Sequence, residues 1–236
     1  MRAVILAGGK GMRLRPYTTI LPKPLVPVGE RPVLEHLIKQ LAREQFTHID
    51  VSVGHLGGLI KAYFDQVGLP EGIEVHYWWE ESPMGTAGGL RAIEGLADAG
   101  TFLVMNGDIL TTLRFGDLLR YHEAQEAALT ISTHRKDVQL ELGVIESEDR
   151  QVTGYIEKPT MRYDVSMGIY AYSQSVLEHI PQAHFDFPDV VHALLAAGER
   201  VATYPDTGIW YDIGTIAEHR RAVEELEANP SLFADD

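Results

Sequence analysis

Basic side chains gather in the first stretch of the chain, MRAVILAGGKGMRLRPYTTILPKP, which holds Arg2, Lys10, Arg13, Arg15 and Lys23. No acidic residue precedes Glu30, although the 236 residues carry 34 acidic and 20 basic side chains, a formal net charge of -14. Glycine backbone can approach an anion closely, and lysine and arginine add mobile and forked positive charge. The stretch is therefore either a solvated basic loop or the cradle of a strongly negative ligand such as a polyphosphate.

The glycine loop LAGGKGMRLRP fits neither of two familiar phosphate-binding patterns. A P-loop requires Ser or Thr directly after its lysine, and Lys10 is followed by Gly11. The dinucleotide fingerprint G-x-G-x-x-G fails because Leu14 stands where the third glycine would be. A phosphate cradle here would be of a third kind.

Two aspartates and a lysine are further candidates for binding such a ligand. Asp108 follows the apolar run TFLVMNG, and Asp212 stands in WYDIG. Lys23 lies between two prolines, whose restricted backbone can hold the lysine at a fixed reach. Each residue also has an ordinary interpretation, as a capping or turn aspartate or as an exposed loop lysine.

Other chemistries find little support in the sequence. The ten histidines form no H-x-x-x-H or H-E-x-x-H pair on a helix, so a zinc site is not expected. The nucleophile elbow G-x-S-x-G is missing. Zero cysteines exclude disulfides and thiolate metal sites and fit a reducing cytoplasm.

Composition also limits the partners. No run of about 18 uncharged apolar residues is present, and the apolar start of MRAVILAGG breaks too early for a signal peptide. A pI near 5.1 argues against a nucleic-acid binder, which needs a broad basic face. We therefore expect a cytoplasmic protein that binds small anions, with no membrane or nucleic-acid partner.

Apolar runs alternate with helical patterns in the first half of the chain. This alternation is typical of an α/β fold, in which right-handed crossovers join the parallel strands of one sheet. In such sheets, ligands bind at the carboxyl ends of the strands. The glycine loop directly follows the first run. The expected strands are 2–7, 48–53, 73–79 and 101–108, and the expected helices are 32–45 (with Pro32 first), 58–66 and 86–96.

The second half predicts mostly strands, at 127–134, 142–147, 152–158 and 166–172, before helices at 187–198 and 216–229. We expect an α/β fold with a Rossmann-like, mostly parallel sheet flanked by helices, and a mixed or antiparallel lobe that carries a second binding surface. No linker separates two domains. Residues 1–236 are therefore predicted to be one domain, with halves at about 1–125 and about 126–236.

The opening stretch resembles the signature of the sugar-1-phosphate nucleotidyltransferases, G-G-x-G-T-R-L-x-P-x-T-x-x-x-P-K-P-L. Further motifs follow in the family's order: PMGTAGGL (83–90), MNGD (105–108), IEKP (156–159), GIYAY (168–172) and WYDIG (210–214). The chain resembles most the short mannose- or heptose-1-phosphate guanylyltransferases. Two positions depart from the pattern: Met12 replaces the usual threonine, and Ser166 replaces a frequent asparagine.

The resemblance implies attack of a sugar 1-phosphate on the α-phosphorus of a nucleoside triphosphate, with release of pyrophosphate. It implies that Arg13 and Lys23 act on the reacting phosphates and that Asp108 and Asp212 bind Mg²⁺. The nucleotide-binding residues so implied are Leu6, Ala7, Gly8, Gly9, Gly11, Met12, Arg13, Glu80, Pro83, Gly85 and Thr86. The sugar-phosphate residues so implied are Asn106, Gly143, Glu157, Lys158, Ser166 and Gly168.

Guanine is the expected base. Glu80 aligns with a family position that contacts the base edge, and one carboxylate can accept both the N1–H and the amino group of guanine. Uracil and thymine present one donor between two carbonyls, which suits an amide better. The alternative for Glu80, or for its neighbour Glu81, is that it faces water after Trp79.

Three other functions stay open at this point. They are a uridylyl- or thymidylyltransferase of the same family, a transferase that acts on a cofactor alcohol, and a non-catalytic regulatory subunit. Retention of Arg13, Lys23, Asp108, Asp212 and Lys158 favours an enzyme over the regulatory subunit. The identity of the sugar and the oligomeric state, including a homo-oligomer, are also open.

Overall fold

A computed structural model describes residues 1–80 and 82–233. Its centre is a sheet of seven strands in the order β12-β8-β11-β6-β1-β4-β5. The strands are β1 (Arg2–Ala7), β2 (Pro27–Val28), β3 (Arg31–Pro32), β4 (His48–Val53), β5 (Glu74–Trp79), β6 (Thr101–Asn106), β7 (Ile109–Thr111), β8 (Leu129–Gln139), β9 (Val144–Glu148), β10 (Gln151–Ile156), β11 (Thr160–Ser173), β12 (Val201–Asp206) and β13 (Trp210–Asp212).

The sheet is mostly parallel, as predicted. Strand β1 pairs in parallel with β4 and β6, β4 with β5, and β12 with β8. Strand β11 is antiparallel to both of its neighbours, β6 and β8. Strands from both halves of the chain therefore belong to one sheet.

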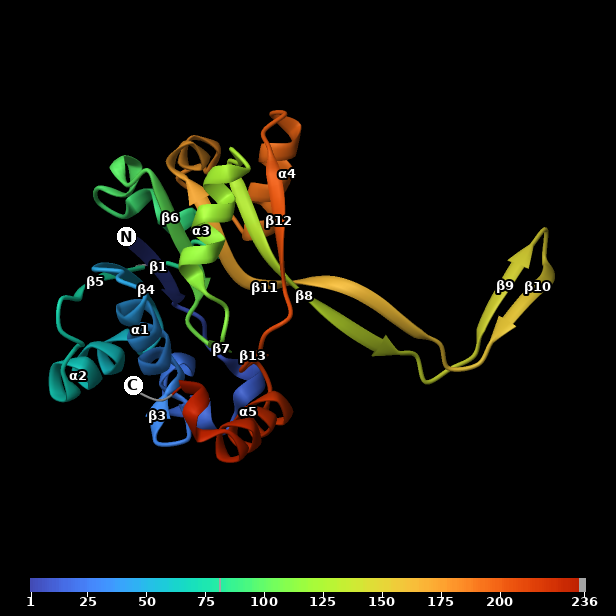
Figure 1. The fold of residues 1–236 in the computed structure, drawn as a ribbon, viewed down its shortest axis with the longest axis horizontal. Coiled ribbons are helices and arrows are strands. Elements are labelled where there is room, and N and C mark those ends of the chain that lie inside the picture. The colour runs from blue at the N-terminus through green and yellow to red at the C-terminus, as the bar shows by residue number, and fades with distance from the viewer. Residues whose placement is uncertain (81, 234–236) are drawn as a thin grey trace.

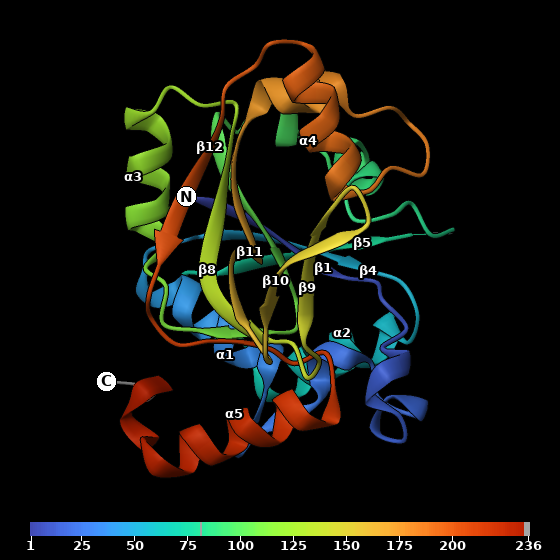
Figure 2. The same ribbon diagram turned by 90° about the vertical axis from the view of Figure 1, so that its right-hand side faces the viewer.

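Helices and short turns cover both faces of the sheet. The helices are α1 (Val33–Arg43), α2 (Gly57–Val67), α3 (Phe115–Ala124), α4 (Phe187–Ala196) and α5 (Ile216–Ala228). Alternate side chains of β1 define the two faces: Ile5 packs with residues of α1, α2 and α3, whereas Val4 packs with residues of α4. Figure 2 shows α1 and α4 on opposite sides of the strands.

A third cluster of apolar side chains lies under α5. It joins Leu14, Val28 and Leu110 to Ile213 and Ala222. The C-terminal helix is thereby held against the loop that follows β1 and against the paired strands β7 and β13.

The antiparallel lobe expected in the second half includes an arm that extends from the central sheet. Strand β8 pairs with β12 only as far as His134, and β11 pairs with β6 only from Ile169. Between these points β8 and β11 pair with each other and lead to the hairpin β9–β10. Figure 1 shows this segment, residues 135–166, projecting far from the body of the molecule. We call it the arm.

One predicted helix is wrong. Residues 86–96 form short 3₁₀ turns, at Gly88–Ala92 and Leu96–Asp98, instead of a continuous α-helix. Glycine is a poor helix former, and Gly88 is packed directly against the carbonyl oxygen of Ala183. Helix α1 also begins one residue later than predicted, because Pro32 is its N-cap. No helix among the described residues is long and apolar enough to span a bilayer.

Candidate active site

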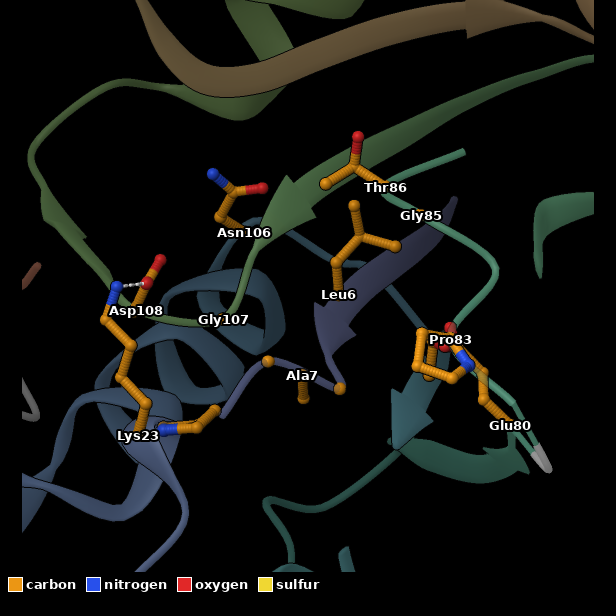
Figure 3. A pocket seen from close by; sticks show the side chains of 14 residues that line it. Leu6, Ala7, Lys23, Glu80, Pro83, Gly85, Thr86, Asn106, Gly107 and Asp108 are labelled. Carbon is orange, nitrogen blue, oxygen red and sulfur yellow. Dashed lines mark hydrogen bonds and ion pairs between the residues drawn. The ribbon is translucent and has the colours of Figure 1, made fainter. Parts of the chain in front are cut away.

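A pocket of about 340 Å³ opens at the carboxyl edge of the parallel strands. The strand order β6-β1-β4-β5 sets the ends of these four strands side by side along it. Figure 3 shows Glu80 at one end of the pocket, Lys23 and Asp108 at the other, and Leu6 and Ala7 between them. The lining residues are Leu6, Ala7, Gly8, Gly9, Lys23, Pro24, Ser52, Glu80, Pro83, Gly85, Thr86, Asn106, Gly107 and Asp108.

At one end Glu80, which follows β5, faces the pocket and not open water. The Ser52 hydroxyl donates a hydrogen bond of 2.7 Å to Glu80 Oε1, which fixes the carboxylate. A Cβ built at Gly8 would lie 3.6 Å from Glu80 Oε2, so the glycine loop borders the same carboxylate. Trp79 is 55% exposed, and Glu81 lies outside the described residues. Glu80, at the end of β5, thus offers the pocket a hydrogen-bond acceptor whose position is fixed.

At the other end Lys23 forms an ion pair with Asp108, and its Nζ lies 3.7 Å from Asp212 Oδ1. Strand pairing brings Asp108 and Asp212 together, although they lie far apart in the sequence. Strand β13 pairs with β7, and the backbone N–H of Ile213 donates to the carbonyl of Asp108 at 2.9 Å. The two aspartates, far apart in the chain, therefore face one lysine.

The donor set at this end suits a hard divalent cation. Burial raises the pKa of the Asp108 carboxyl, and the Lys23 ammonium opposes that shift. Asp108 Oδ1 is buried and has no hydrogen-bond partner among the described residues. A buried, unsatisfied carboxylate oxygen beside a second carboxylate is the kind of ligand set that Mg²⁺ completes with phosphate oxygens and water.

The glycine loop folds back on Lys23. Gly11 has a left-handed φ of 60°, and a Cβ there would lie 2.9 Å from Thr18 Cγ2 and 3.1 Å from Lys23 Cβ. The Thr18 hydroxyl donates to the carbonyl of Gly11 at 2.7 Å. Gly11 thus shapes the loop without lining the pocket. Met12 is exposed, at 55%.

Arg13 is exposed at the rim on the Asp212 side. Its guanidinium lies 3.3 Å from where a Cβ of Gly214 would stand. Arg13 is thus beside the aspartate end of the pocket but is not part of its lining.

The Gly85–Thr86 segment is braced by residues that the sequence did not single out. The backbone N–H of Thr86 donates to Asp186 Oδ1 at 2.9 Å, and the N–H of Phe187 donates to the Thr86 hydroxyl at 2.7 Å. Asp186 also caps helix α4. The pocket wall and α4 therefore share one aspartate. Other lining residues that sequence reasoning missed are Ser52, Pro24 and Gly107.

Three of the predicted sugar-phosphate residues lie on the body of the molecule or at the base of the arm. Asn106 ends β6 and lines the pocket. A Cβ at Gly168 would lie 2.6 Å from Asn106 Nδ2, so β11 passes directly beside it. The Ser166 hydroxyl accepts from the backbone N–H of Gly168 at 3.2 Å. This group forms the side of the site next to the base of the arm.

The other three lie on the arm, where the β8–β11 ribbon meets the β9–β10 hairpin. Tyr155 covers Gly143 closely, and its hydroxyl donates to Glu157 Oε2 at 2.8 Å. Lys158 Nζ is 4.0 Å from Glu141 Oε2, and the Lys158 backbone has a left-handed φ of 45°. The structure thus divides the predicted sugar-phosphate residues between two places, the pocket and the arm.

A separate group of metal-ligating side chains lies at the start of β4 and β5. His48, Glu74 and His76 bring their ligand atoms within 4.8 Å of one another. The two imidazole rings are stacked, with an interplanar angle of 18° and centroids 4.6 Å apart. Because an imidazole binds a metal in the plane of its ring, two stacked rings cannot share one ion without rearranging.

The fold and the pocket define an α/β protein with a pocket at the carboxyl edge of its parallel strands. A family model described as nucleotidyl transferase matches residues 2–229, so the chain belongs to the nucleotidyl transferase family. Mannose-1-phosphate guanylyltransferase of Mycobacterium tuberculosis is 32% identical over 95% of this chain and 64% of its own length. UTP–glucose-1-phosphate uridylyltransferase of Synechocystis is 31% identical over 94% of this chain and 62% of its own length.

The chain therefore spans about three fifths of the length of these curated relatives. Among solved structures, HddC from Yersinia pseudotuberculosis superposes with a TM-score of 0.75 at 24% identity and covers 95% of this chain and 99% of its own. A second crystal structure of HddC is a complex with GMP-PN. At this identity the likeness establishes the shared fold.

Proposed function

We propose that the protein transfers a nucleotidyl group from a nucleoside triphosphate to a sugar 1-phosphate, with release of pyrophosphate. The observation that carries the proposal is the pocket itself. It joins a base-reading carboxylate, Glu80, to a cation–carboxylate cluster at Lys23, Asp108 and Asp212 across the glycine loop. A nucleotide laid along the strand ends would place its base and its phosphates at these two ends.

The reaction needs positive charge beside the phosphates and does not need a general base. The attacking phosphate oxygen is already ionised; it forms a bond to the α-phosphorus while the bond to pyrophosphate breaks. Both substrates are anions, so the protein must position them and reduce their repulsion. Lys23 is held in place for the reacting phosphates, and Arg13 at the rim reaches the leaving pyrophosphate.

Asp108 and Asp212 would hold Mg²⁺ in this reaction. The ion would supply positive charge for the phosphate oxygens of the nucleotide. The chain's own contribution is to present two carboxylates and to keep Lys23 between them.

Guanine is the base that we propose. The held carboxylate of Glu80 can accept both donors on the guanine edge, and uracil or thymine offers only one. Overall similarity gives no preference, because a guanylyltransferase and a uridylyltransferase match at 32% and 31% identity. The cysteine-free composition fits a reaction in the reducing cytoplasm.

A panel of nucleoside triphosphates crossed with sugar 1-phosphates, read by pyrophosphate release, tests the proposal. We expect release that depends on a divalent metal and is fastest with GTP. Lys23→Ala should lower the rate by roughly two to three decades, the usual effect of losing one preorganised charge contact. The control is Lys61→Ala, which removes an exposed lysine paired with Asp65 on α2.

Each other outcome has a definite meaning. A preference for UTP or dTTP would replace guanine with the uridylyl or thymidylyl alternative. No release with any pair would contradict the enzyme and favour the regulatory subunit.

A further inference from the structure

The arm is an amphipathic ribbon. Facing pairs in the register of β8 and β11 share one side, and successive pairs alternate between sides. One side carries two cross-strand ion pairs, Arg135 with Asp164 and Asp137 with Arg162, each at 3.2 Å. This side of the arm is therefore polar and faces water.

The opposite side of the arm is mostly apolar, with one charged residue, Lys136, whose Nζ lies 4.0 Å from Glu218 Oε1 of α5. Val138 faces Met161 across the ribbon, and Tyr163 faces Lys136. Leu140 continues the same side, two residues after Val138. The exposed fractions of these apolar side chains are 39% for Val138, 40% for Leu140, 43% for Met161 and 50% for Tyr163.

The hairpin at the end of the arm is exposed as well. Ile145, Val152 and Tyr155 are 60%, 68% and 62% exposed. A two-stranded ribbon is at best marginally stable in water unless another surface covers its apolar side. Apolar side chains arranged on one side, with ion pairs on the other, therefore indicate a partner for this side.

The chain's own pocket is out of reach of the hairpin. The pairs from Thr160–Gln139 to Ser166–Thr133 extend β8 and β11 beyond the body sheet, after a register shift between Ser166 and Tyr170. This pairing directs the hairpin away from the body (Figure 1). With the ribbon extended in this way, the hairpin does not lie on its own body (Figure 1).

A second copy of the chain supplies the complementary charge. Residues 140–159 carry five acidic and two basic side chains, all exposed. The loop beside the pocket exposes Lys10, Arg13 and Arg15, and no acid precedes Glu30. The acidic hairpin of one copy therefore matches the basic pocket mouth of another, and a two-fold axis would make both contacts at once.

We propose that two copies exchange their arms, so that the apolar side of each ribbon packs on the other chain and each hairpin closes the other chain's pocket. Glu157 and Lys158 of one copy then complete the site formed by Lys23, Asp108 and Asn106 of the other. This second part rests on the proposed function, whereas the exchange itself does not.

Sedimentation equilibrium of the full chain tests the exchange. We expect a mass of two chains for the native protein. Val138→Lys with Met161→Glu charges the apolar side and should give a monomer. The matched control is Gln139→Lys with Thr160→Glu, the neighbouring facing pair on the polar side, which should remain a dimer. A monomeric native protein, or equal masses for the two double variants, would overturn the exchange.

Cross-linking tests where the hairpin lies, without any need for activity. The chain has no cysteine, so single cysteines can be placed at will. Ser147→Cys marks the hairpin, and Gly9→Cys marks the pocket, where a Cβ meets nothing within 4 Å. A mixture of the two variants treated with a bismaleimide should form a covalent dimer that neither variant forms alone. Failure of the mixed pair to cross-link would contradict hairpin-over-pocket closure.

Complementation tests the shared site. Lys23→Ala and Lys158→Ala, each defective alone, are co-expressed. We expect about one quarter of native activity, because half of randomly assembled dimers are mixed and each mixed dimer has one intact site. Activity no higher than that of the single variants would place both lysines in one chain's site. If native protein lacks transferase activity, the proposed function fails while the mass and cross-linking results still decide the exchange.

Discussion

At the charged end of the pocket, the two oxygens of the Asp108 carboxylate have different surroundings. Lys23 satisfies one oxygen of Asp108 and leaves the other, Oδ1, buried without a hydrogen-bond partner among the described residues. Asp212 is more open, with its side chain 41% exposed against 16% for Asp108. Asp108 Oδ1 and the Asp212 carboxylate are the groups that would hold the proposed Mg²⁺.

Asp108→Ala and Asp212→Ala should each lose most of the turnover, because the phosphates then repel one another without a fixed counter-charge. In a magnesium titration, the residual activity should respond less to the ion at low concentration and reach half of its maximum at a higher magnesium concentration. Asp65→Ala, which removes an exposed aspartate of α2, is the control. Full activity in either pocket variant, correctly folded, would remove that aspartate from the metal site.

The other end of the pocket depends on Glu80. Glu80→Gln keeps one oxygen that can accept from the Ser52 hydroxyl but replaces the other carboxylate oxygen with an amide donor. Guanine therefore loses one of its two hydrogen bonds. The ratio of kcat/KM for GTP over UTP should fall by roughly tenfold, in the range of one base-reading contact. Glu74→Gln, on the exposed side of the same strand, should leave the ratio unchanged. An unchanged ratio in Glu80→Gln would assign base selection to backbone groups of the Gly85–Gly89 loop.

Among the elements, the parallel strands of the first half were predictable and the arm was not. Run 2–7 is apolar after Arg2, run 48–53 alternates polar and apolar residues, and a glycine follows each. The structure confirms both strands with the same bounds. The length of β8 and β11 is hidden, because the outer part of β8 is mostly charged or polar and that of β11 alternates polar and apolar residues like any surface strand. Helix α3 and strand β12 were also missed.

Much of the site could be predicted because the glycine loop directly follows β1. The partnership of Asp108 with Asp212 could be suggested only by family resemblance, because it arises from pairing of two three-residue strands. Ser52 and Asp186 could not be found at all. A serine within a strand and an aspartate before a helix have ordinary roles, and only the fold brings them to the pocket.

The wrongly predicted helix at 86–96 gives a prediction about the pocket wall. A Cβ at Gly88 would overlap the carbonyl oxygen of Ala183, a backbone atom that cannot swing away. Gly88→Ala should lower the free energy of unfolding by about 1–3 kcal/mol, as overpacking does, and raise KM for the nucleotide. Gly58→Ala, in α2 with no atom near the new methyl group, should be neutral or stabilising. Equal stability of the two variants would show that the Gly88 loop can move.

At the scale of the whole molecule, both halves of the chain share one sheet and its stability. The sheet joins strands from residue 2 to residue 206, and a buried imidazole lies where α3 packs on β8. His122 is 1% exposed, with its ring nitrogens 2.8 Å from the Thr130 hydroxyl and 3.0 Å from the Ser173 hydroxyl. Burial lowers the pKa of His122 to about 4. His36, in α1, also has a lowered pKa because of burial.

These histidines make the fold sensitive to acid. The unfolded chain binds a proton at His122 near pH 6.5, whereas the folded chain resists it until about pH 4. The unfolded state therefore binds more protons in this window, and stability falls as the pH falls through it. The raised pKa of Asp108 acts in the opposite direction, because the folded state there binds its proton first.

His122→Gln keeps a polar side chain between the two hydroxyls but cannot take up the proton. The free energy of unfolding, measured by urea titration at pH 7.5 and pH 5, should fall on the order of 1 kcal/mol less for the variant than for the native protein. His55→Gln, which changes an exposed histidine, should keep the native pH dependence. If His122→Gln loses as much stability between the two pH values as the native protein, protonation of His122 does not drive the acid sensitivity, and His36 becomes the group to change next.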